Sequence, residues 1–161
     1  MRVYHTFGSV YDKNSRILIL GSMPSVKSRE FGFYYMHPRN RFWPIIESLL
    51  NEPIPISIEE KISFLKRRRI ALWDVVSCCE IKGSADASIK NAEPNDLEKL
   101  LKETEIKQIF TNGKTADKLY KTLYPKDLLP QPICLPSTSP ANAAYSLLKL
   151  IDEWKIILKY L

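Results

Sequence analysis

Residues 34–43, YYMHPRNRFW, combine side chains that can stack, form hydrogen bonds and carry charge. The segment holds four aromatic residues, two arginines, a histidine and an asparagine around one proline. A strand of the hydrophobic core does not tolerate the charges, and a plain surface loop does not need the rings. The composition therefore indicates a segment that holds a ligand.

Three further segments are rich in small polar residues, glycine and proline. They are GSMPS at 21–25, TNG at 111–113 and PSTSPANA at 136–143, and each lies at the end of a short apolar run. Such residues allow backbone N–H groups to point outward at an anion. A fourth polar position, Asp74, lies near the end of another apolar run. These positions are candidates for further parts of a binding site.

The apolar runs predict four strands, at 16–21, 70–76, 108–113 and 132–137. Their sequences, RILILG, IALWDVV, QIFTNG and PICLPS, contain β-branched and aromatic residues and do not alternate with polar ones. This pattern is typical of strands that are buried on both faces. The runs therefore predict a sheet that is covered by other elements.

Amphipathic patterns between and after these runs predict helices. SIEEKISFLKRRR begins with Ser57 and has Glu60 three residues later, which is a capping box, and NDLEKLLKETE repeats this spacing with Asn95 and Glu98. RFWPIIESLL and GKTADKLYKTLY are also helical in pattern. The stretch 142–161 has one apolar stripe, formed by Leu147, Leu150, Ile151, Trp154, Ile157, Leu158 and Leu161.

The order of these elements predicts the fold class. Strands alternate with helices, which indicates an α/β fold with a parallel sheet and helices on both faces. The length of 161 residues predicts one domain, 1–161, because domains have roughly 100–200 residues. Ligands of such sheets bind beyond the carboxyl ends of the strands. The polar segments after the strands are therefore expected to meet there.

Charge and composition narrow the partners and the chemistry. The net charge of +6 favours polyanionic partners, nucleic acid first. Three cysteines, two of them adjacent, do not suggest a disulfide framework, and together with two distant histidines they show no zinc spacing. No G-x-G-x-x-G or Walker A sequence occurs. We therefore expect neither a metal nor a cofactor.

The cellular location follows from the apolar runs. None approaches the ~20 residues of a membrane span. The first residues, MRVYHTFGSVYDKNSR, lack the apolar region of a signal peptide. We expect a cytoplasmic protein that acts as a monomer and does not bind membranes.

Four segments, in this order, resemble the motifs of a known enzyme family. GSMPS, YYMHPRNRFW, LWDVV and LPSTSPANA are similar to motifs of the uracil-DNA glycosylase superfamily, and most of all to its hypoxanthine-DNA (deoxyinosine) glycosylase branch. Mismatch-specific uracil glycosylases carry GINPG and then FAHPxNRFW at a similar spacing. The resemblance runs from about residue 5 to the end of the chain. It implies a three-layer α/β/α sandwich with a four-stranded parallel sheet.

Two departures from the family pattern concern catalysis. Members usually carry Asp, Asn or Glu at the third position of the first motif, where it helps to position the attacking water. This chain has Met23, whose thioether cannot take a proton from water. The last motif, HPS in the best-known members, is LPS here, so Leu135 replaces a histidine that helps to stabilise the departing base. The deoxyinosine branch shares both absences, and the resemblance implies that it relies on the asparagine of HPRN.

The resemblance also assigns a base pocket. It places Tyr35 at the aromatic residue that stacks on the extruded base. Asn40 matches the asparagine of NRFW and is the expected catalytic residue, whose side-chain oxygen orients water. The backbone amides of Ser22 and Met23 are candidates to stabilise the leaving base anion. Asp74 is expected to accept the N1–H group of hypoxanthine, which adenine lacks.

Each of these roles has a structural alternative. Asn40 can be only the N-cap of the helix that follows it. Tyr35 can belong to the core. Asp74 can cap the turn after its strand. His37 is a base-binding candidate, but it can equally hold its own loop by hydrogen bonds.

Contacts with the DNA backbone need neutral donors and some positive charge. The candidate hydroxyl and amide donors are in the first and last motifs, and the candidate cations lie close to the first two. Pro140, Ala141 and Asn142 lie on a loop that can wedge into the duplex. The full set of DNA-binding candidates is Ser25, Lys27, Arg39, Arg41, Ser137, Thr138, Ser139, Pro140 and Asn142.

Together these observations predict a monofunctional DNA glycosylase. Its partner is DNA that contains a deaminated base, and it hydrolyses the N-glycosidic bond of that base, most of all hypoxanthine, after the nucleotide is flipped out. No lysine lies in the four motifs, so we expect hydrolysis without a Schiff base. One alternative is a uracil or mismatch-specific uracil glycosylase. Another, of a different class, is a lesion-binding module without catalysis.

Overall fold

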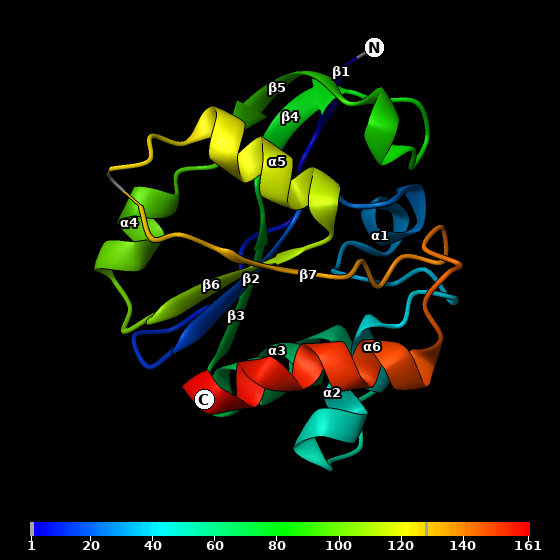
Figure 1. Ribbon diagram of the computed structural model, residues 1–161, viewed down its shortest axis with the longest axis vertical. Coiled ribbons are helices and arrows are strands. Elements are labelled where there is room, and N and C mark those ends of the chain that lie inside the picture. The colour runs from blue at the N-terminus through cyan, green and yellow to red at the C-terminus, as the bar shows by residue number, and fades with distance from the viewer. Residues whose placement is uncertain (1, 128) are drawn as a thin grey trace.

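The centre of the molecule is a parallel sheet of four strands. A computed structural model describes residues 2–127 and 129–161. The strands are β2 (Ile17–Gly21), β3 (Ile70–Asp74), β6 (Gln108–Asn112) and β7 (Ile133–Leu135), in the order β3-β2-β6-β7. Helices cover both faces (Figure 1). The predicted α/β/α sandwich with a four-stranded parallel sheet is confirmed.

Alternating side chains of β2 face the two helical layers. Ile17 and Ile19 pack into a core with α2 (Phe42–Leu50), α3 (Ile58–Arg67) and α6 (Leu147–Trp154). Leu18 and Leu20 pack into a second core with α4 (Leu97–Lys102) and α5 (Lys114–Leu123). All four β2 side chains are fully buried. The apolar runs lack polar alternation because water reaches neither face of this strand.

A second, smaller sheet was not predicted. It is antiparallel and consists of β1 (Arg2–Tyr4), β4 (Val76–Glu80) and β5 (Lys90–Pro94), in the order β1-β4-β5. The prediction of one strand at 70–76 is therefore wrong, since β3 ends at Asp74 and β4 begins at Val76. The run passes from Asp74 directly into Val75 and Val76 without a glycine or proline, so the sequence contains no turn signal for the change of sheet. The connection from β4 to β5 contains a short 3₁₀ helix, η1 (Asp86–Ser88).

The helix caps agree with the sequence in one case and not in another. Ser57 caps α3, and its side chain accepts a hydrogen bond from the backbone N–H of Glu60. The predicted cap Asn95 is wrong, because the N-cap of α4 is Asp96. The Asn95 amide instead donates to the carbonyl of Asp74, at 2.8 Å, and to that of Val76, at 3.3 Å. It therefore stabilises the junction between β3 and β4.

The C-terminal stretch forms a shorter α-helix than its pattern predicts. α6 ends at Trp154, and the chain continues as a 3₁₀ helix, η2 (Lys155–Tyr160). Leu150, Trp154 and Ile157 of the predicted stripe are fully buried. Leu147, at the start of the stripe, and Leu158, near its end, remain 39% and 42% exposed. The tighter 3₁₀ winding shifts later side chains away from the α-helical face.

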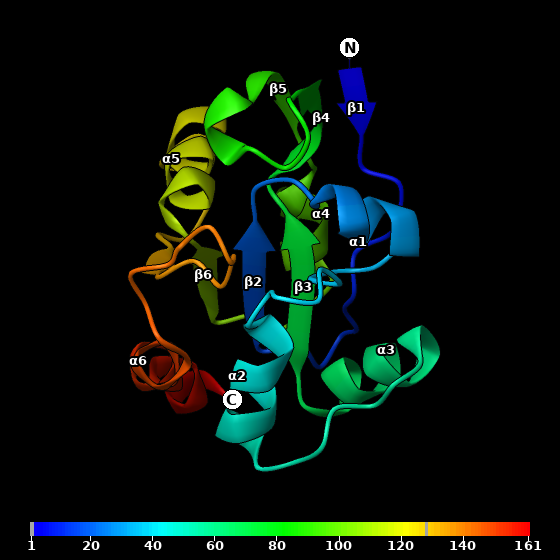
Figure 2. The same ribbon diagram turned by 90° about the vertical axis from the view of Figure 1, so that its right-hand side faces the viewer.

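The carboxyl ends of the parallel strands point at one group of loops. Figure 2 shows β2 and β3 running toward the short helix α1 (Val26–Phe31) and the small antiparallel sheet. The 34–41 segment joins α1 to α2. Its backbone is attached to α1, because the N–H of Met36 donates to the hydroxyl of the buried Ser28 at 3.0 Å. The ligand-holding segment is thus fixed beside the strand ends.

Candidate active site

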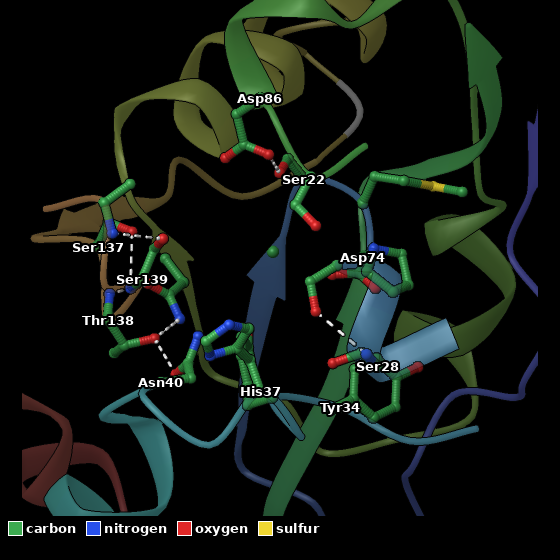
Figure 3. Close-up of a pocket in the computed structure, with 18 of the residues that line it drawn as sticks. Ser22, Ser28, Tyr34, His37, Asn40, Asp74, Asp86, Ser137, Thr138 and Ser139 are labelled. Atoms are coloured by element: carbon green, nitrogen blue, oxygen red, sulfur yellow. Dashed lines mark hydrogen bonds between the residues drawn. The ribbon is translucent and has the colours of Figure 1, made fainter. Parts of the chain in front are cut away.

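A cavity of about 260 Å³ lies beyond the carboxyl ends of the central strands. The four motif segments, which are far apart in the sequence, all contribute to its walls. Figure 3 shows how the side chains gather around it. The predicted site residues that line it are Ser22, Met23, Ser25, Tyr35, His37, Asn40, Asp74, Ser137, Thr138, Ser139 and Pro140.

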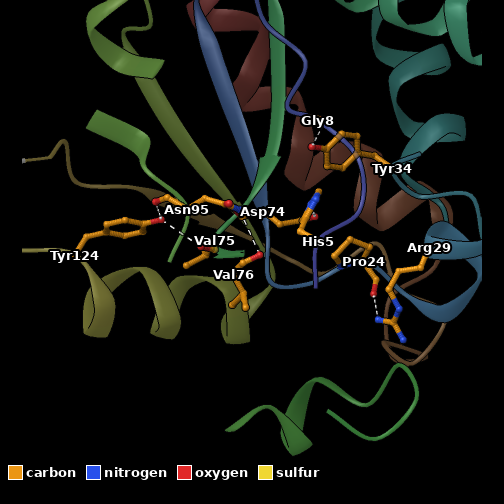
Figure 4. A network of polar contacts seen from close by, with 10 residues as sticks. All are labelled: His5, Gly8, Pro24, Arg29, Tyr34, Asp74, Val75, Val76, Asn95 and Tyr124. Carbon is orange, nitrogen blue, oxygen red and sulfur yellow. Dashed lines mark hydrogen bonds and ion pairs between the residues drawn. The ribbon is translucent and has the colours of Figure 1, made fainter. Parts of the chain in front are cut away.

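At the end of β3, Asp74 is buried in the wall of this cavity. Its Oδ2 lies 2.7 Å from Nε2 of His5, and each of the two side chains is only 4% exposed (Figure 4). A carboxylate can only accept hydrogen bonds, so this nitrogen of His5 donates to it. His5 packs against the rings of Phe7 and Tyr34, which fix its orientation. The sequence reasoning missed His5 altogether.

The other Asp74 oxygen lies against Gly21. A Cβ atom at Gly21 would stand 2.4 Å from Oδ1 of Asp74. Any residue other than glycine would therefore displace this carboxylate. Among the described residues, neither carboxylate oxygen accepts a backbone N–H, so the proposed turn-capping role of Asp74 is not what the geometry shows. We call His5, Gly21, Tyr35 and Asp74 the floor of the cavity.

Tyr35 is a rigid part of this floor. Its backbone has a φ of 55°, which is unusual for a residue other than glycine, and its ring stacks on Phe42 with centroids 4.2 Å apart. The Tyr35 hydroxyl is buried and has no hydrogen-bond partner among the described residues. Burial, and then the nearby charge of Asp74, raise the pKa of this hydroxyl. It therefore stays protonated and can donate to a ligand.

The neighbouring rings belong mainly to the core. Phe42 and Trp43 are 0% and 9% exposed. Tyr34 is 2% exposed, and its hydroxyl donates to the carbonyl of Gly8 at 2.9 Å (Figure 4). Tyr34 reaches the cavity wall, but its hydroxyl points away to a structural partner.

His37 holds its own loop. The backbone N–H of Arg39 donates to Nδ1 of His37 at 3.0 Å. A nitrogen that accepts a hydrogen bond carries no proton, so in the neutral ring the proton is on Nε2. The loop-holding alternative is therefore observed, and Nε2 can donate to a ligand in the cavity.

Asn40 is anchored through its side-chain oxygen. Oδ1 accepts from the backbone N–H of Phe42 and from the hydroxyl of Thr138, both at 2.9 Å (Figure 3). A backbone N–H can only donate, so this contact identifies the oxygen of the amide. Both lone pairs are then in use, and the prediction that this oxygen holds the water is wrong. The Nδ2 group makes no hydrogen bond to the described residues, so it is the atom that can meet a ligand.

Asn112 completes this anchoring and was not predicted. Its Nδ2 donates to the hydroxyl of Thr138, and its Oδ1 accepts from the Thr138 backbone N–H, both at 3.0 Å. Thr138 is only 1% exposed, so its hydroxyl faces Asn40 and Asn112 rather than DNA. This corrects its prediction as a DNA contact. We call Asn40, Asn112 and Thr138 the asparagine wall.

Arg41 binds the backbone of the loop that contains the last motif. Its guanidinium donates to the carbonyls of Ser139 at 2.8 Å, of Asn142 at 3.0 Å and of Tyr145. Its backbone N–H donates to Thr138. These contacts engage the guanidinium with the loop, so Arg41 is a structural residue here and not the predicted phosphate contact.

The loop at 137–142 is fixed by hydrogen bonds of its own side chains. The hydroxyl of Ser137 accepts from the backbone N–H of Ser139, and that of Ser139 accepts from the N–H of Ala141, both at 3.1 Å. The Asn142 side chain donates to the carbonyl of Ser137 at 2.9 Å. Asn142 thus closes the loop internally, while Pro140 is exposed. The wedge role of this loop stays a prediction.

The remaining DNA-binding candidates differ in their surroundings. Ser25 is the N-cap of α1 and accepts from the N–H of Ser28. Lys27 is exposed and lies 3.4 Å from Glu30, and Arg39 is exposed beside the cavity loop. Exposed cations of this kind remain available to phosphates.

A second carboxylate, Asp86, also lines the cavity and was not predicted. It comes from η1, and its Oδ1 accepts a hydrogen bond from the hydroxyl of Ser22 at 2.9 Å. Burial raises the pKa of Asp86 and the charge of Asp74 raises it further, while the bond from Ser22 lowers it. The isolated sequence SADAS gave no signal, because the partner of Asp86 is 64 residues away.

Within residues 2–127 and 129–161, no group of three or more His, Cys, Asp or Glu side chains is placed to hold a metal ion. None of the helices in the same residues combines the length and the apolar character that a membrane crossing requires.

The cavity and the order of its motifs can be compared with known proteins. The family model described as the uracil DNA glycosylase superfamily matches residues 8–161. The chain belongs to the uracil DNA glycosylase superfamily. The resemblance of the four motifs to this superfamily is therefore confirmed.

Individual members of the superfamily are similar over most of the chain. A protein of Methanosarcina acetivorans named hypoxanthine DNA glycosylase is 34% identical over 156 residues, which are 96% of this chain and 97% of that protein. One of the same name from Methanosarcina barkeri is 38% identical over 113 residues, 68% of this chain and 71% of its own. A solution NMR structure of a candidate uracil DNA glycosylase from M. acetivorans covers 95% of this chain and 94% of its own, with 34% identity and a TM-score of 0.81.

Proposed function

We propose that this protein is a monofunctional DNA glycosylase that hydrolyses the N-glycosidic bond of deoxyinosine and releases hypoxanthine. One observation supports the proposal. A single cavity at the strand ends is lined by Tyr35, whose ring stacks on another ring of the core, by the buried carboxylate of Asp74 and by the anchored side chain of Asn40. The names of the two Methanosarcina relatives support hypoxanthine as the base. We also propose that it acts as a monomer, without a metal or a cofactor.

The floor accounts for selection of the base. Oδ2 of Asp74 is occupied by His5, which leaves Oδ1 beside Gly21 as an acceptor. Hypoxanthine presents an N1–H donor to such an oxygen, whereas adenine presents a lone pair at N1 and is repelled. The N–H group of His5 donates to Oδ2 and so holds the carboxylate in this orientation. The hydroxyl of Tyr35 is a donor for a polar atom of the same base.

The asparagine wall accounts for stabilisation of the leaving base. Bond cleavage moves negative charge onto the purine, and preorganised N–H donors stabilise such charge. Nδ2 of Asn40 is a donor of this kind, since its oxygen is held by Phe42 and Thr138. The backbone amides of Ser22 and Met23, in the same cavity wall, are further donors. Asn40 has no proton to transfer at neutral pH, so its role is to donate and to position.

A panel of oligonucleotide duplexes tests this function. Each duplex carries one inosine, uracil or xanthine, and strand breaks are read with and without alkali. We expect breaks at inosine only after alkali, because hydrolysis leaves an abasic site and a monofunctional enzyme does not cut the strand. EDTA should not change the yield. An Asn40→Ala protein purified in the same way is the control for contaminating glycosylases.

Each part of the proposal can fail separately in this panel. Tight binding of inosine DNA without abasic product would support the lesion-binding alternative. Preferential cleavage at uracil would support the uracil alternative, since uracil also offers an N–H group to Asp74. Inhibition by EDTA would overturn the metal-free assignment.

A further inference from the structure

The cavity contains two carboxylates, and the floor uses only one of them. Asp86 is half-buried in η1, between β4 and β5 of the small sheet. Its Oδ1 is held by the hydroxyl of Ser22, which is itself only 6% exposed. Its Oδ2 has no hydrogen-bond partner among the described residues. Figure 3 shows this pair on a different side of the cavity from Asn40 and Thr138.

The carboxylate of Asp86 is bound to Ser22, and the residue that follows Ser22 is a methionine. Met23 lies in the cavity wall and cannot accept a proton from water. The loop after β2 therefore has no side chain of its own that can take a proton from the attacking water. The hydrogen bond from Ser22 brings a carboxylate from the β4–β5 connection to this same loop.

We propose that Asp86 is the catalytic base of the reaction and activates the water that attacks the sugar; this inference rests on the proposed glycosylase function. The C1′–N9 bond breaks, and its electron pair goes to the purine. The water oxygen bonds to C1′ as Asp86 takes one of its protons. The hypoxanthine anion takes a proton from solvent, and Asp86 returns its proton to solvent. The products are free hypoxanthine and an abasic site.

The other polar groups of the cavity are less suited to this step. Oδ2 of Asp74 is bound to His5 at 2.7 Å, and its Oδ1 is needed for the base. Nδ1 of His37 already accepts a hydrogen bond, and its other nitrogen carries the proton. The amide of Asn40 has no basic lone pair. Oδ2 of Asp86 is thus the basic atom that remains open to water. A carboxylate here also stabilises the positive charge that builds on the sugar.

Asp86 is not needed to hold the β4–β5 connection in place. The backbone N–H of Val26 donates to the hydroxyl of Ser84 at 2.9 Å, and the guanidinium of Arg29 reaches the carbonyl of Gly83 at 3.3 Å. These contacts attach the connection to α1 independently of the carboxylate. Replacement of the charge should therefore leave the fold intact.

The charged groups around Asp86 define its pH dependence. Within the cavity it faces Asp74 and His37, and in a neighbouring cavity of about 620 Å³ it shares the wall with Lys114 of α5 and Glu153 of α6. Cys79 of β4 is near enough for the charge of Asp86 to act on it, and Arg29 of α1 donates to the carbonyl of Gly83 in the same connection. Burial raises the pKa of Asp86 above its ordinary value of 3.8. The single-turnover rate should therefore rise with pH across a range that lies above the usual aspartate titration.

Asp86→Asn is the decisive variant, because the amide oxygen can still accept from Ser22 while the base is lost. We expect single-turnover excision of inosine to fall on the order of 10²-fold, which is the lower end of the usual range for the loss of a general base. Affinity for the inosine duplex should change by less than about threefold, because the contact acts on the chemical step. The acid limb of the pH–rate profile should disappear. Asp152→Asn is the matched control, because it makes the same charge change at an exposed residue of α6 whose side chain pairs with Lys155.

Ser22→Ala is a second test that keeps the carboxylate. The hydrogen bond from Ser22 lowers the pKa of Asp86, so its loss should move the acid limb to higher pH. An Asp86→Asn protein with wild-type rates, or with reduced rates and an unchanged acid limb, would overturn the role as a base. An acid limb that does not move in Ser22→Ala would also contradict it. These outcomes leave the proposed function standing, whereas an inactive wild type would remove the function itself.

Discussion

The floor and the asparagine wall face the same cavity but are built on different principles. The floor contains a buried carboxylate, and one of its oxygens accepts a hydrogen bond from a histidine. The wall consists of neutral side chains that form hydrogen bonds with one another. The Thr138 hydroxyl accepts from Asn112 and donates to the side-chain oxygen of Asn40. A charged acceptor distinguishes bases by the protons that they carry. A neutral donor stabilises a departing base whatever its identity.

The largest effect should come from the wall. Asn40→Ala removes both the anchor and the Nδ2 donor, and we expect single-turnover excision to fall on the order of 10²-fold or more. Asn40→Asp keeps an oxygen for Phe42 and Thr138 but has no N–H group, so it should be nearly as slow. If Asn40→Asp restored wild-type rates, Asn40 would be an anchor only.

Gly21→Ala should be the next largest change, and it concerns the floor. The added methyl group would stand 2.4 Å from Oδ1 of Asp74 and 3.2 Å from the Tyr35 hydroxyl. The carboxylate must then move, so we expect a loss of excision of roughly 10- to 10²-fold, as for other small misplacements of catalytic groups. At Gly8, no atom lies within 4 Å of an added Cβ. Gly8→Ala is therefore the control, and equal rates in the two variants would show that the floor tolerates displacement.

His5→Gln should have a smaller effect on the same carboxylate. Glutamine can still donate to Oδ2 of Asp74, but it lacks the ring that packs against Phe7 and Tyr34 and fixes the donor in place. We expect about a tenfold lower rate on inosine, in line with a weakened hydrogen bond to a charged group, with little change in melting temperature. A large drop in the melting temperature together with the rate would instead identify His5 as a structural residue.

The smallest expected effect is on stability, and it concerns Asp86. A carboxyl group whose pKa is raised by folding favours the folded state while it is protonated, and this advantage is lost as the pH rises through the raised pKa. Asp86→Asn does not titrate. Its melting temperature relative to the wild type should therefore increase from acid to neutral pH, on the order of a few °C at most. If the melting temperature of Asp86→Asn relative to the wild type instead fell from acid to neutral pH, the charge of Asp86 would stabilise the fold.

The sequence predicted those features that depend on local pattern. The four central strands follow from continuous apolar runs, and the α3 cap follows from the Ser57–Glu60 spacing. The segments at 21–25, 34–43 and 136–143 were expected to meet because they follow strands of one parallel sheet. Their convergence in one cavity agrees with this expectation.

What the sequence could not reveal are partners that meet only through folding. His5 lies 69 residues from Asp74, and Asp86 lies 64 residues from Ser22. Neither pair has a local spacing that identifies it. The atom-level error at Asn40 has the same origin, because the hydroxyl that occupies its oxygen comes from Thr138, 98 residues away. The small sheet was missed because its outer strands, β1 and β5, are short and mostly exposed and contain no continuous apolar run.

The measurement that most directly tests the division between floor and wall compares rates on two bases. Single-turnover rates are measured for inosine and for the next best base of the panel, with the wild type, Asp74→Asn and Asn40→Asp. We predict that Asp74→Asn changes the ratio of the two rates by about tenfold or more, as expected when a buried acceptor that reads a base is altered. Asn40→Asp should lower both rates and leave their ratio within about threefold of the wild type. If Asn40→Asp changed the ratio as much as Asp74→Asn, or if neither variant changed it, the assignment of recognition to the floor and of chemistry to the wall would be contradicted.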